Sequence, residues 1–310
     1  MTTSQDTISF EGQAAIVTGG GNGLGRAYCL ELAARGAKVL VNDLGSSISG
    51  DGSSTQHAET VAEEIRSKGG EAIAAAADVT DKEAVAAMAQ QAKDAFGRID
   101  ILIASAGIIR DKSFGKMPLD QFDMVADVDT KGAAYCSHAV WPIMKDQGYG
   151  RIVYTTSGSA VFGNFGQANY AAGKLGVLGL LQVLKIEGAR SNIHVNAIAP
   201  AAHTRMSDAY LMDKLKPLYG PEKVAALAMY LASADAPNGD IISAGGGFYG
   251  LVQFMEAEGA ILDDPTPEKI RDSWGAVSDM SAAQYHFDLA SEQNSIVRRV
   301  CAKAGVDIDV

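Results

Sequence analysis

The stretch QAAIVTGGGNGLG, residues 13–25, decides the fold of this chain. Its first six residues are mostly apolar, with β-branched side chains among them, which is typical of a short buried strand. The glycine-rich remainder leads into a helix expected over residues 26–35. Glycine lacks a Cβ atom, so a backbone turn there can approach a ligand closely and adopt positive φ. The pattern predicts either a tight strand-to-helix turn or a site where a dinucleotide pyrophosphate meets helix N-terminal amides.

Apolar runs alternate with helical segments along the rest of the chain. Strands are expected over residues 13–18, 37–43, 71–79, 99–107, 151–156, 193–200 and 240–247. Helices are expected over residues 26–35, 57–68, 81–96, 119–146, 168–190 and 221–234. This alternation predicts an α/β fold, a single-domain Rossmann-type doubly wound parallel sheet of about seven strands with helices on both faces. We expect one domain over residues 1–310, with its core at about 10–245 and a C-terminal extension, 246–310, packed on it.

Asp43, at the end of the second expected strand, favours the nucleotide interpretation. A carboxylate there accepts hydrogen bonds from the adenosine ribose hydroxyls and repels a 2′-phosphate. No Lys or Arg occurs in residues 18–25 or just after Asp43, so the pattern favours NAD over NADP. A loop cap is the structural alternative for Asp43. Asp78, after the third strand, fits an adenine contact and a turn residue equally well.

A second stretch, RIVYTTSGSAVFGNFGQANYAAGK at residues 151–174, carries the candidate chemistry. Its strand ends in a hydroxyl cluster that includes Ser157, and the following helix places Tyr170 and Lys174 on one face. An unperturbed phenol titrates near pH ~10, so it needs a nearby cation to act as a base near neutrality. With Lys174 as that cation and Ser157 bonded to a substrate oxygen, Tyr170 can move a proton on or off a carbinol oxygen.

That chemistry requires a cofactor, because no side chain in the stretch accepts a hydride. The motif Tyr-x-x-x-Lys is weak by itself. Its structural alternative is a half-buried tyrosine tethered by its hydroxyl, beside a lysine whose ammonium is solvated.

Composition limits the partners. The net charge of −11 and the absence of a long basic run argue against nucleic acid or an anionic membrane. Cys29, Cys136 and Cys301 show neither metal-ligand nor disulfide spacing, which predicts no metal and a reducing compartment. The chain shows no signal-peptide pattern, no apolar run of membrane length and no C-terminal address signal. We therefore expect a cytoplasmic protein that acts on small molecules.

Thr18–Gly25, Asp43, Ser157, Tyr170 and Lys174 together resemble the short-chain dehydrogenase/reductase family, over about residues 10–245. The resemblance implies an NAD-dependent dehydrogenase in which Tyr170 is the acid/base and Ser157 orients the substrate oxygen. It also implies that Lys174 holds the nicotinamide ribose and lowers the pKa of Tyr170. The implied cofactor-binding residues are Gly19, Asn22, Gly23, Leu24, Gly25, Asp43, Asp78, Val79, Ala106, Gly107, Tyr170, Lys174, Pro200 and Thr204.

Longer segments, FGNFGQANYAAGKLG and IEGARSNIHVNAIAP among them, are similar to one subgroup of that family. This subgroup is the dehydrogenase unit of D-specific peroxisomal multifunctional β-oxidation enzymes, with bacterial single-unit relatives. It implies oxidation of (3R)-3-hydroxyacyl-CoA to 3-oxoacyl-CoA, in fatty-acyl or steroid side-chain β-oxidation. A hydroxysteroid dehydrogenase is the alternative enzyme, and a catalytically silent NAD(H)-binding scaffold is the alternative of another class. The resemblance also suggests a homodimer or homotetramer through residues 119–146 and 168–190.

Candidate substrate residues follow from that substrate class. Phe162, Phe165 and the irregular excursion 206–219 would line an apolar pocket. Arg110, with Lys112 and Lys116, is a candidate for the phosphates of coenzyme A. A solvated loop surface is the alternative interpretation of these three cations.

Three positions depart from the family pattern. Ser105 and Asp129 stand where the family usually has asparagines, and Ala201 follows Pro200 where glycine is usual. The two missing asparagines are the support for the silent scaffold. Asp129 stays a candidate catalytic residue, because an acid can accept the hydrogen bonds of a water linked to Lys174, with a changed pH dependence.

Overall fold

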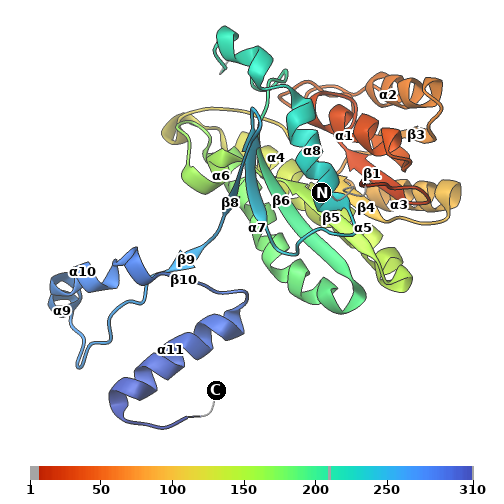
Figure 1. The fold of residues 1–310 in the computed structure, drawn as a ribbon. Helices are drawn as coiled ribbons and strands as arrows, with labels where there is room; N and C mark the ends of the chain where they lie inside the picture. The colour runs from red at the N-terminus through yellow and green to blue at the C-terminus, as the bar shows by residue number, and fades with distance from the viewer. Residues whose placement is uncertain (1–6, 209–210, 309–310) are drawn as a thin grey trace, which may run out of the picture. The chain divides into compact units, whose positions relative to one another are not determined.

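The structure is a computed structural model that describes residues 7–208 and 211–308. Its central sheet has eight strands in the order β3-β2-β1-β4-β5-β6-β7-β8 (Figure 1). Strands β1 to β7 pair in parallel. Their bounds are β1 Ala14–Thr18, β2 Lys38–Asn42, β3 Ala72–Ala75, β4 Ile101–Ala104, β5 Gly150–Thr155, β6 Ile193–Ala201 and β7 Ile241–Gly245. The predicted doubly wound α/β fold is confirmed.

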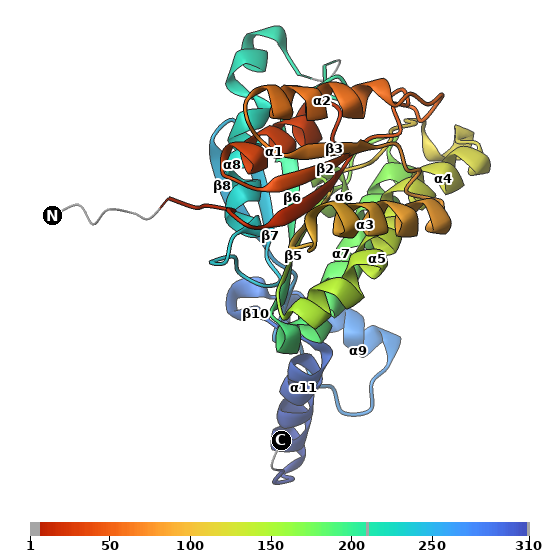
Figure 2. The ribbon, with the colours of Figure 1, turned by 90° about the vertical axis from the view of Figure 1, so that its right-hand side faces the viewer.

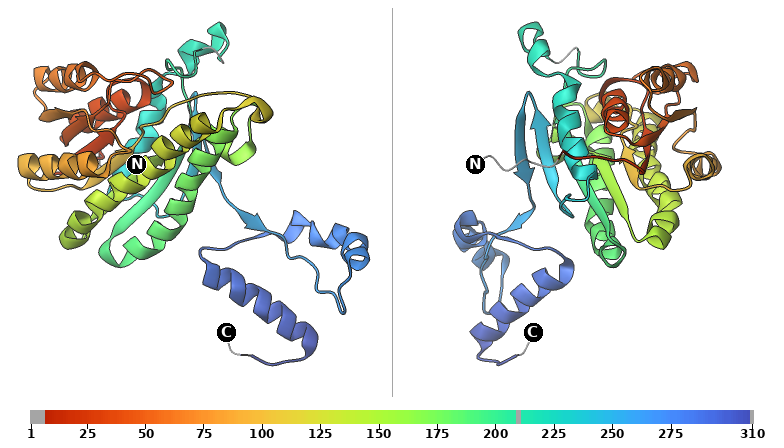
Figure 3. Two further views of the ribbon diagram at one scale, coloured as in Figure 1. Left: turned by 180° about the vertical axis from the view of Figure 1, so that it is seen from behind. Right: turned by 45° about the vertical axis from the view of Figure 1, so that its right-hand side comes forward.

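Helices cover both faces of the sheet (Figure 2). One layer contains α1, α2 and α8, and the other contains α3, α5 and α7, as the view from behind also shows (Figure 3). The helices of this part are α1 Gly23–Ala34, α2 Gln56–Ser67, α3 Lys82–Phe96, α4 Leu119–Ala126, α5 Gly132–Gln147, α6 Gly158–Phe162, α7 Ala168–Gly188 and α8 Pro221–Ala232. Every residue of β1 and β5 is buried, as expected for central strands of a sheet covered on both sides.

The strand register brings the candidate residues to one edge of the sheet. Thr18, the last residue of β1, pairs with Asn42 of β2 and with Ala104 of β4. The glycine turn, Asp43 and Ser105 therefore follow three neighbouring strands at their carboxyl ends. Strand order reverses between β1 and β4, which is the place where doubly wound sheets bind their ligands.

Several elements differ from the sequence prediction, which did not include the short helix α6. The helix expected over residues 119–146 is interrupted by one π-helical turn, η2, at Asp127–Lys131. An eighth strand, β8 at Phe248–Val252, follows β7 after only two residues, so it runs antiparallel to its neighbour. Both connecting residues, Gly246 and Gly247, have positive φ. The sequence prediction missed this turn, because no polar residue separates the two strands in the run AGGGF and its glycines were included in the preceding strand.

The chain divides into two compact units, Met1–Leu251 and Val252–Val310. The second unit contains the two-stranded sheet of β9 and β10 and three short helical segments besides a longer helix, with none of its described residues buried. Its elements are β9 Met255–Glu256, α9 Pro267–Asp272, α10 Trp274–Val277, η5 Met280–Ala282, β10 Gln284–Tyr285 and α11 Leu289–Ala304. That residues 246–310 pack on the core as part of one domain stays a prediction. Across the described residues of both units, no helix has the length and apolarity needed to cross a bilayer.

Candidate active site

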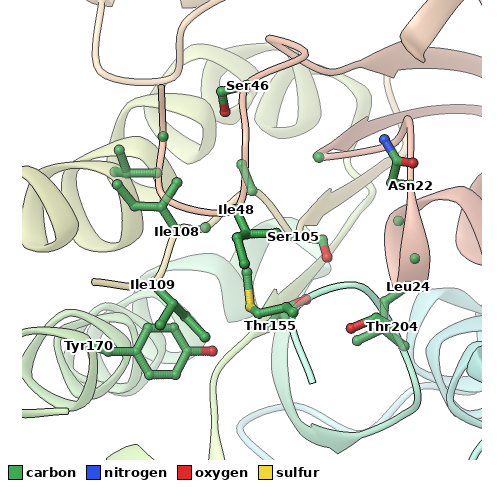
Figure 4. A pocket seen from close by; sticks show the side chains of 18 of the residues that line it. Asn22, Leu24, Ser46, Ile48, Ser105, Ile108, Ile109, Thr155, Tyr170 and Thr204 are labelled. Carbon is green, nitrogen blue, oxygen red and sulfur yellow. The ribbon is translucent and has the colours of Figure 1, made fainter. Parts of the chain in front are cut away.

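A cavity of about 940 Å³ lies at the carboxyl ends of the strands (Figure 4). Residues from both sequence stretches line it, so the fold brings the glycine turn and the Ser-Tyr-Lys group together. The lining includes all the predicted cofactor residues, namely Gly19, Asn22, Gly23, Leu24, Gly25, Asp43, Asp78, Val79, Ala106, Gly107, Tyr170, Lys174, Pro200 and Thr204. Ser157 lines it as well. Within the described ranges, no three His, Cys, Asp or Glu side chains are placed to hold a metal ion.

The glycine turn fits a nucleotide phosphate. Gly19 and Gly23 adopt φ values of 67° and 51°, in the left-handed region that disfavours other residues. The helix that follows has no side-chain cap at Asn22, so the first N–H groups of α1 stay available to an anion. The Nδ2 donor of Asn22 is itself buried without a hydrogen-bond partner in the described part of the chain. A bound pyrophosphate would accept hydrogen bonds from these unpaired donors on the cavity wall.

A substitution at Gly25 tests the role of the glycine turn, because the neighbouring atoms leave no space for a side chain there. A Cβ atom at Gly25 would lie 2.1 Å from the carbonyl oxygen of Gly19. We expect Gly25→Ala to shift the start of α1, to destabilise the protein by about 1–3 kcal/mol and to weaken NADH binding at least ~10-fold. Urea unfolding and NADH fluorescence titration measure the two effects. Gly179→Ala in α7 is the control, since a Cβ there meets no atom within 4 Å, and equal behaviour of the two variants would contradict the prediction.

Asp43 fulfils both sequence interpretations. Its Oδ2 accepts a hydrogen bond from the Gly21 N–H at 2.8 Å, and its Oδ1 accepts one from the Gly45 N–H at 2.7 Å. The carboxylate thus holds the glycine turn and the next loop in place, as a cap does. It also lines the cavity, where its remaining lone pairs can accept ribose hydroxyls.

Tyr170 directs its hydroxyl into the cavity (Figure 4). Tyr170 is 9% exposed, and the Ser157 hydroxyl lies near enough to lower the pKa of the phenol. Burial raises the pKa of Tyr170 above its ordinary value, and the nearby Asp129 charge adds to this rise. The Lys174 ammonium acts in the opposite direction, as predicted, but does not outweigh burial. Lys174 therefore lowers the pKa of Tyr170 as the family resemblance implied, although burial keeps the net pKa above its ordinary value.

Lys174 is paired with Asp129 inside the protein. Asp129 lies in the π-helical turn, and its Oδ1 is 3.2 Å from Lys174 Nζ, with the two side chains 0% and 4% exposed. Burial raises the pKa of Asp129 to about 6, against the opposing effect of Lys174. Burial also disfavours the ammonium, but Asp129 and Tyr170 together raise the pKa of Lys174 above its ordinary value. Lys174 is therefore held in its charged form.

Two glycines make room for this ion pair. A Cβ atom on Gly107 would lie 2.7 Å from Asp129 Oδ1 and 2.9 Å from Lys174 Nζ. A Cβ on Gly173 would lie 3.0 Å from the Asp129 Cβ atom. Sequence reasoning assigned Gly107 to the cofactor only and missed Gly173, because neither glycine is near Asp129 in the chain.

The predicted substrate residues do not line the cavity. Phe162 and Phe165 are 75% and 89% exposed, because Phe162 ends the short helix α6 and Phe165 lies between Gly163 and Gly166, which both have positive φ. Arg110 donates from Nε to the Ser49 carbonyl and from Nη2 to Asp51, at 2.7 and 2.8 Å. This arginine is thus engaged in holding a loop.

Other residues form the apolar wall of the cavity, and sequence reasoning missed them. They are Ile48, Ile108, Ile109, Met124, Val128 and Met206. Ile108 and Ile109 could have been found, because they directly follow the predicted cofactor residue Gly107. Of the excursion 206–219, Met206 and Ser207 reach the cavity, whereas residues 209–210 lie outside the described residues.

A glycine turn at the reversal point of a parallel sheet, with a Ser-Tyr-Lys group on the same cavity, defines a nicotinamide-dependent oxidoreductase of the α/β class. The chain belongs to the short chain dehydrogenase family, whose sequence model matches residues 13–214. It is therefore a dehydrogenase that uses a nicotinamide cofactor.

The similarity to individual relatives extends beyond the residues that the family model matches. The peroxisomal multifunctional enzyme type 2 of Drosophila melanogaster is 42% identical over 309 residues, which cover 98% of this chain and 51% of the relative. The structure of that full-length enzyme matches with a TM-score of 0.79 and 36% identity, over 96% of this chain and 50% of the other. A 7α-hydroxysteroid dehydrogenase complexed with NADH and 7-oxo glycochenodeoxycholic acid matches with a TM-score of 0.71 and 29% identity, over 80% and 98% of the two chains. This chain therefore spans about half the length of the Drosophila enzyme.

Proposed function

We propose that this dehydrogenase oxidises (3R)-3-hydroxyacyl-CoA to 3-oxoacyl-CoA with NAD. The observation that carries the proposal is the Tyr170 hydroxyl, which points into a cavity between an apolar wall and the nucleotide-binding turn. An acyl chain matches the wall formed by Ile108, Ile109 and Met124, while a secondary alcohol matches the Ser157–Tyr170 pair. Nearly the whole chain is also similar to a peroxisomal multifunctional enzyme.

Ser157, Tyr170 and Lys174 have separate roles in the proposed reaction. Ser157 hydrogen-bonds the substrate oxygen, and deprotonated Tyr170 accepts the hydroxyl proton as the ketone forms. NAD held by the glycine turn and Asp43 would supply the acceptor for the hydride of the carbinol carbon. Lys174 stabilises the phenolate through its charge, and Asp129 keeps that lysine protonated. The proton leaves Tyr170 for solvent, so each turnover yields one ketone, one NADH and one proton.

A substrate panel tests the proposal. We expect NADH formation with (3R)-3-hydroxyacyl-CoA and little with the 3S enantiomer. The alternative, a hydroxysteroid dehydrogenase, is favoured by the apolar wall and by the similarity to the 7α-hydroxysteroid dehydrogenase structure. Turnover of steroid alcohols without turnover of acyl-CoA alcohols would replace our proposal with this alternative.

Asp43 supports the choice of NAD over NADP, because its charge would lie beside a 2′-phosphate. We expect Asp43→Asn to keep an acceptor for only one of the two backbone N–H groups, of Gly21 and Gly45, and to raise the NADP-to-NAD ratio of kcat/KM by about 10-fold or more, since like-charge juxtaposition costs several kcal/mol. Steady-state kinetics with both cofactors measures the ratio. Asp127→Asn is the control, because Asp127 also lines the cavity but lies in the π-helical turn η2 and not after β2. An unchanged ratio in the Asp43 variant would remove Asp43 from cofactor selection.

Assembly and location belong to the same proposal. The exposed side chains of Leu175, Val183 and Ile186 form an apolar strip on α7 that suits a homodimer or homotetramer. Light scattering of the purified protein tests this assembly. The expected cytoplasmic location stays a prediction, because relatives of this chain are named as peroxisomal enzymes.

A further inference from the structure

Five charged side chains line the cavity, and one of them differs from the others in its surroundings. Three are acidic, Asp43, Asp78 and Asp127, and two are basic, Lys174 and Arg205. Lys174 is paired with Asp129, as described above. The guanidinium of Arg205 is exposed and forms no hydrogen bond or ion pair within residues 7–208 and 211–308. Arg205 is thus the cation on this cavity wall that is left for a ligand.

The chain around Arg205 is fixed against the glycine turn. A Cβ atom on Gly23 would lie 3.2 Å from Thr204 Cγ2, so the residue before Arg205 packs directly on the turn. Figure 4 shows Thr204 beside Leu24 at the start of α1. Ser207 holds the segment in shape, since its Oγ accepts the Thr204 N–H at 2.9 Å and donates to the Ala202 carbonyl. Arg205 therefore stands at the edge of the cavity next to the N-terminus of α1.

We propose that Arg205 binds a phosphate group of a nucleotide ligand in this cavity. Two ligands supply that chemistry, the pyrophosphate of the dinucleotide and the pyrophosphate of a coenzyme A thioester. A guanidinium recognises phosphate oxygens through two parallel hydrogen bonds, which a lysine cannot reproduce. The chain carries a net charge of −11, so an anionic ligand needs a local cation to offset the field of the protein. The coenzyme A alternative rests on the proposed function, whereas the dinucleotide alternative rests only on the family.

Direct binding measurements separate the two sources without depending on turnover. Wild type, Arg205→Ala and Arg205→Lys are titrated with NADH, with 3-hydroxydecanoyl-CoA and with the N-acetylcysteamine thioester of the same acid, which carries no phosphate. For the dinucleotide, we expect Arg205→Ala to raise the Kd of NADH at least ~10-fold. For the thioester, we expect the same rise for the CoA compound and none for the truncated compound. Arg205→Lys should fall between wild type and Arg205→Ala in either case.

Controls separate this proposal from misfolding and from an error in the proposed function. Arg190→Ala, in the short helix Ala189–Ser191, removes an arginine that does not line the cavity and should change no Kd. Equal thermal unfolding of all variants shows that the fold is kept. Kd values within twofold of wild type for both NADH and the CoA thioester overturn the proposal for Arg205. Failure of the wild type to oxidise 3-hydroxyacyl-CoA overturns the proposed function instead, and the NADH titration still decides the role of Arg205.

Discussion

Replacing Tyr170 by Phe should lower kcat by about 10³-fold while leaving the Kd of NADH nearly unchanged. The substitution removes only the hydroxyl that points into the cavity and keeps the ring that packs against Ile108 and Val125. Without the phenol, the carbinol proton must leave to water, so the loss falls on the chemical step. Initial rates of NADH formation and a fluorescence titration of NADH measure the two quantities. Tyr154→Phe is the matched control, because Tyr154 is also buried but bonds Ser137 outside the cavity.

The pH profile of the wild type gives a second measurement of the same group. Burial raises the pKa of Tyr170, so the phenolate that accepts the proton becomes more abundant as pH rises above neutrality. We expect alcohol oxidation to increase with pH and this limb to be absent from the residual activity of Tyr170→Phe. A variant that keeps more than about a tenth of wild-type kcat, with the same pH limb, would show that Tyr170 is not the base.

Local spacing explains why much of this site could be predicted from sequence. Tyr170 and Lys174 share a helix face whatever the rest of the fold does, and the first strand must deliver Gly19 to a helix N-terminus. Asp43 follows the neighbouring strand, so the parallel register places it beside that turn. Each of these inferences needs only secondary structure and the rule that parallel strands end at one edge of a sheet.

Features that depend on tertiary contacts could not be predicted in this way. Phe162 and Phe165 are apolar, but their exposure is set by the glycine turn that carries them to the surface. The sequence predicts Arg110 as a phosphate ligand, but in the structure its guanidinium donates to Asp51 in a loop distant in the chain. The space for the Asp129 side chain depends on Gly107 and Gly173, and the three residues lie in three different segments of the chain.

Lys174→Met should destabilise the protein by about 3–5 kcal/mol at pH 8, because it leaves the carboxylate of Asp129 buried without its counter-ion. The double variant Asp129→Asn/Lys174→Met removes both charges and should be much closer to wild type. Asp129→Asn alone leaves a buried ammonium and should also cost stability. Urea unfolding of the four proteins gives the coupling energy between the two side chains, which we expect to be favourable by more than about 1 kcal/mol.

The deficit of Lys174→Met should depend on pH in a defined direction. The pKa of Asp129 is about 6 in the folded protein and 3.8 when unperturbed, so the folded state binds the extra proton between these values. A group with this shift makes stability fall as pH rises from about 4 to about 6. The charge of Lys174 lowers the pKa of Asp129, so this pKa is higher in Lys174→Met than in the wild type. The stability of the variant therefore keeps falling as pH rises above 6, whereas the stability of the wild type no longer changes through Asp129. The difference in unfolding free energy between the two proteins should therefore grow from pH 6 to pH 8 and shrink towards pH 5. Two results would contradict this prediction: a difference in unfolding free energy that is constant from pH 5 to pH 8, or one that is absent in Lys174→Met but present in the double variant. Either would mean that Asp129 and Lys174 do not form the ion pair on which the charged state of the catalytic lysine depends.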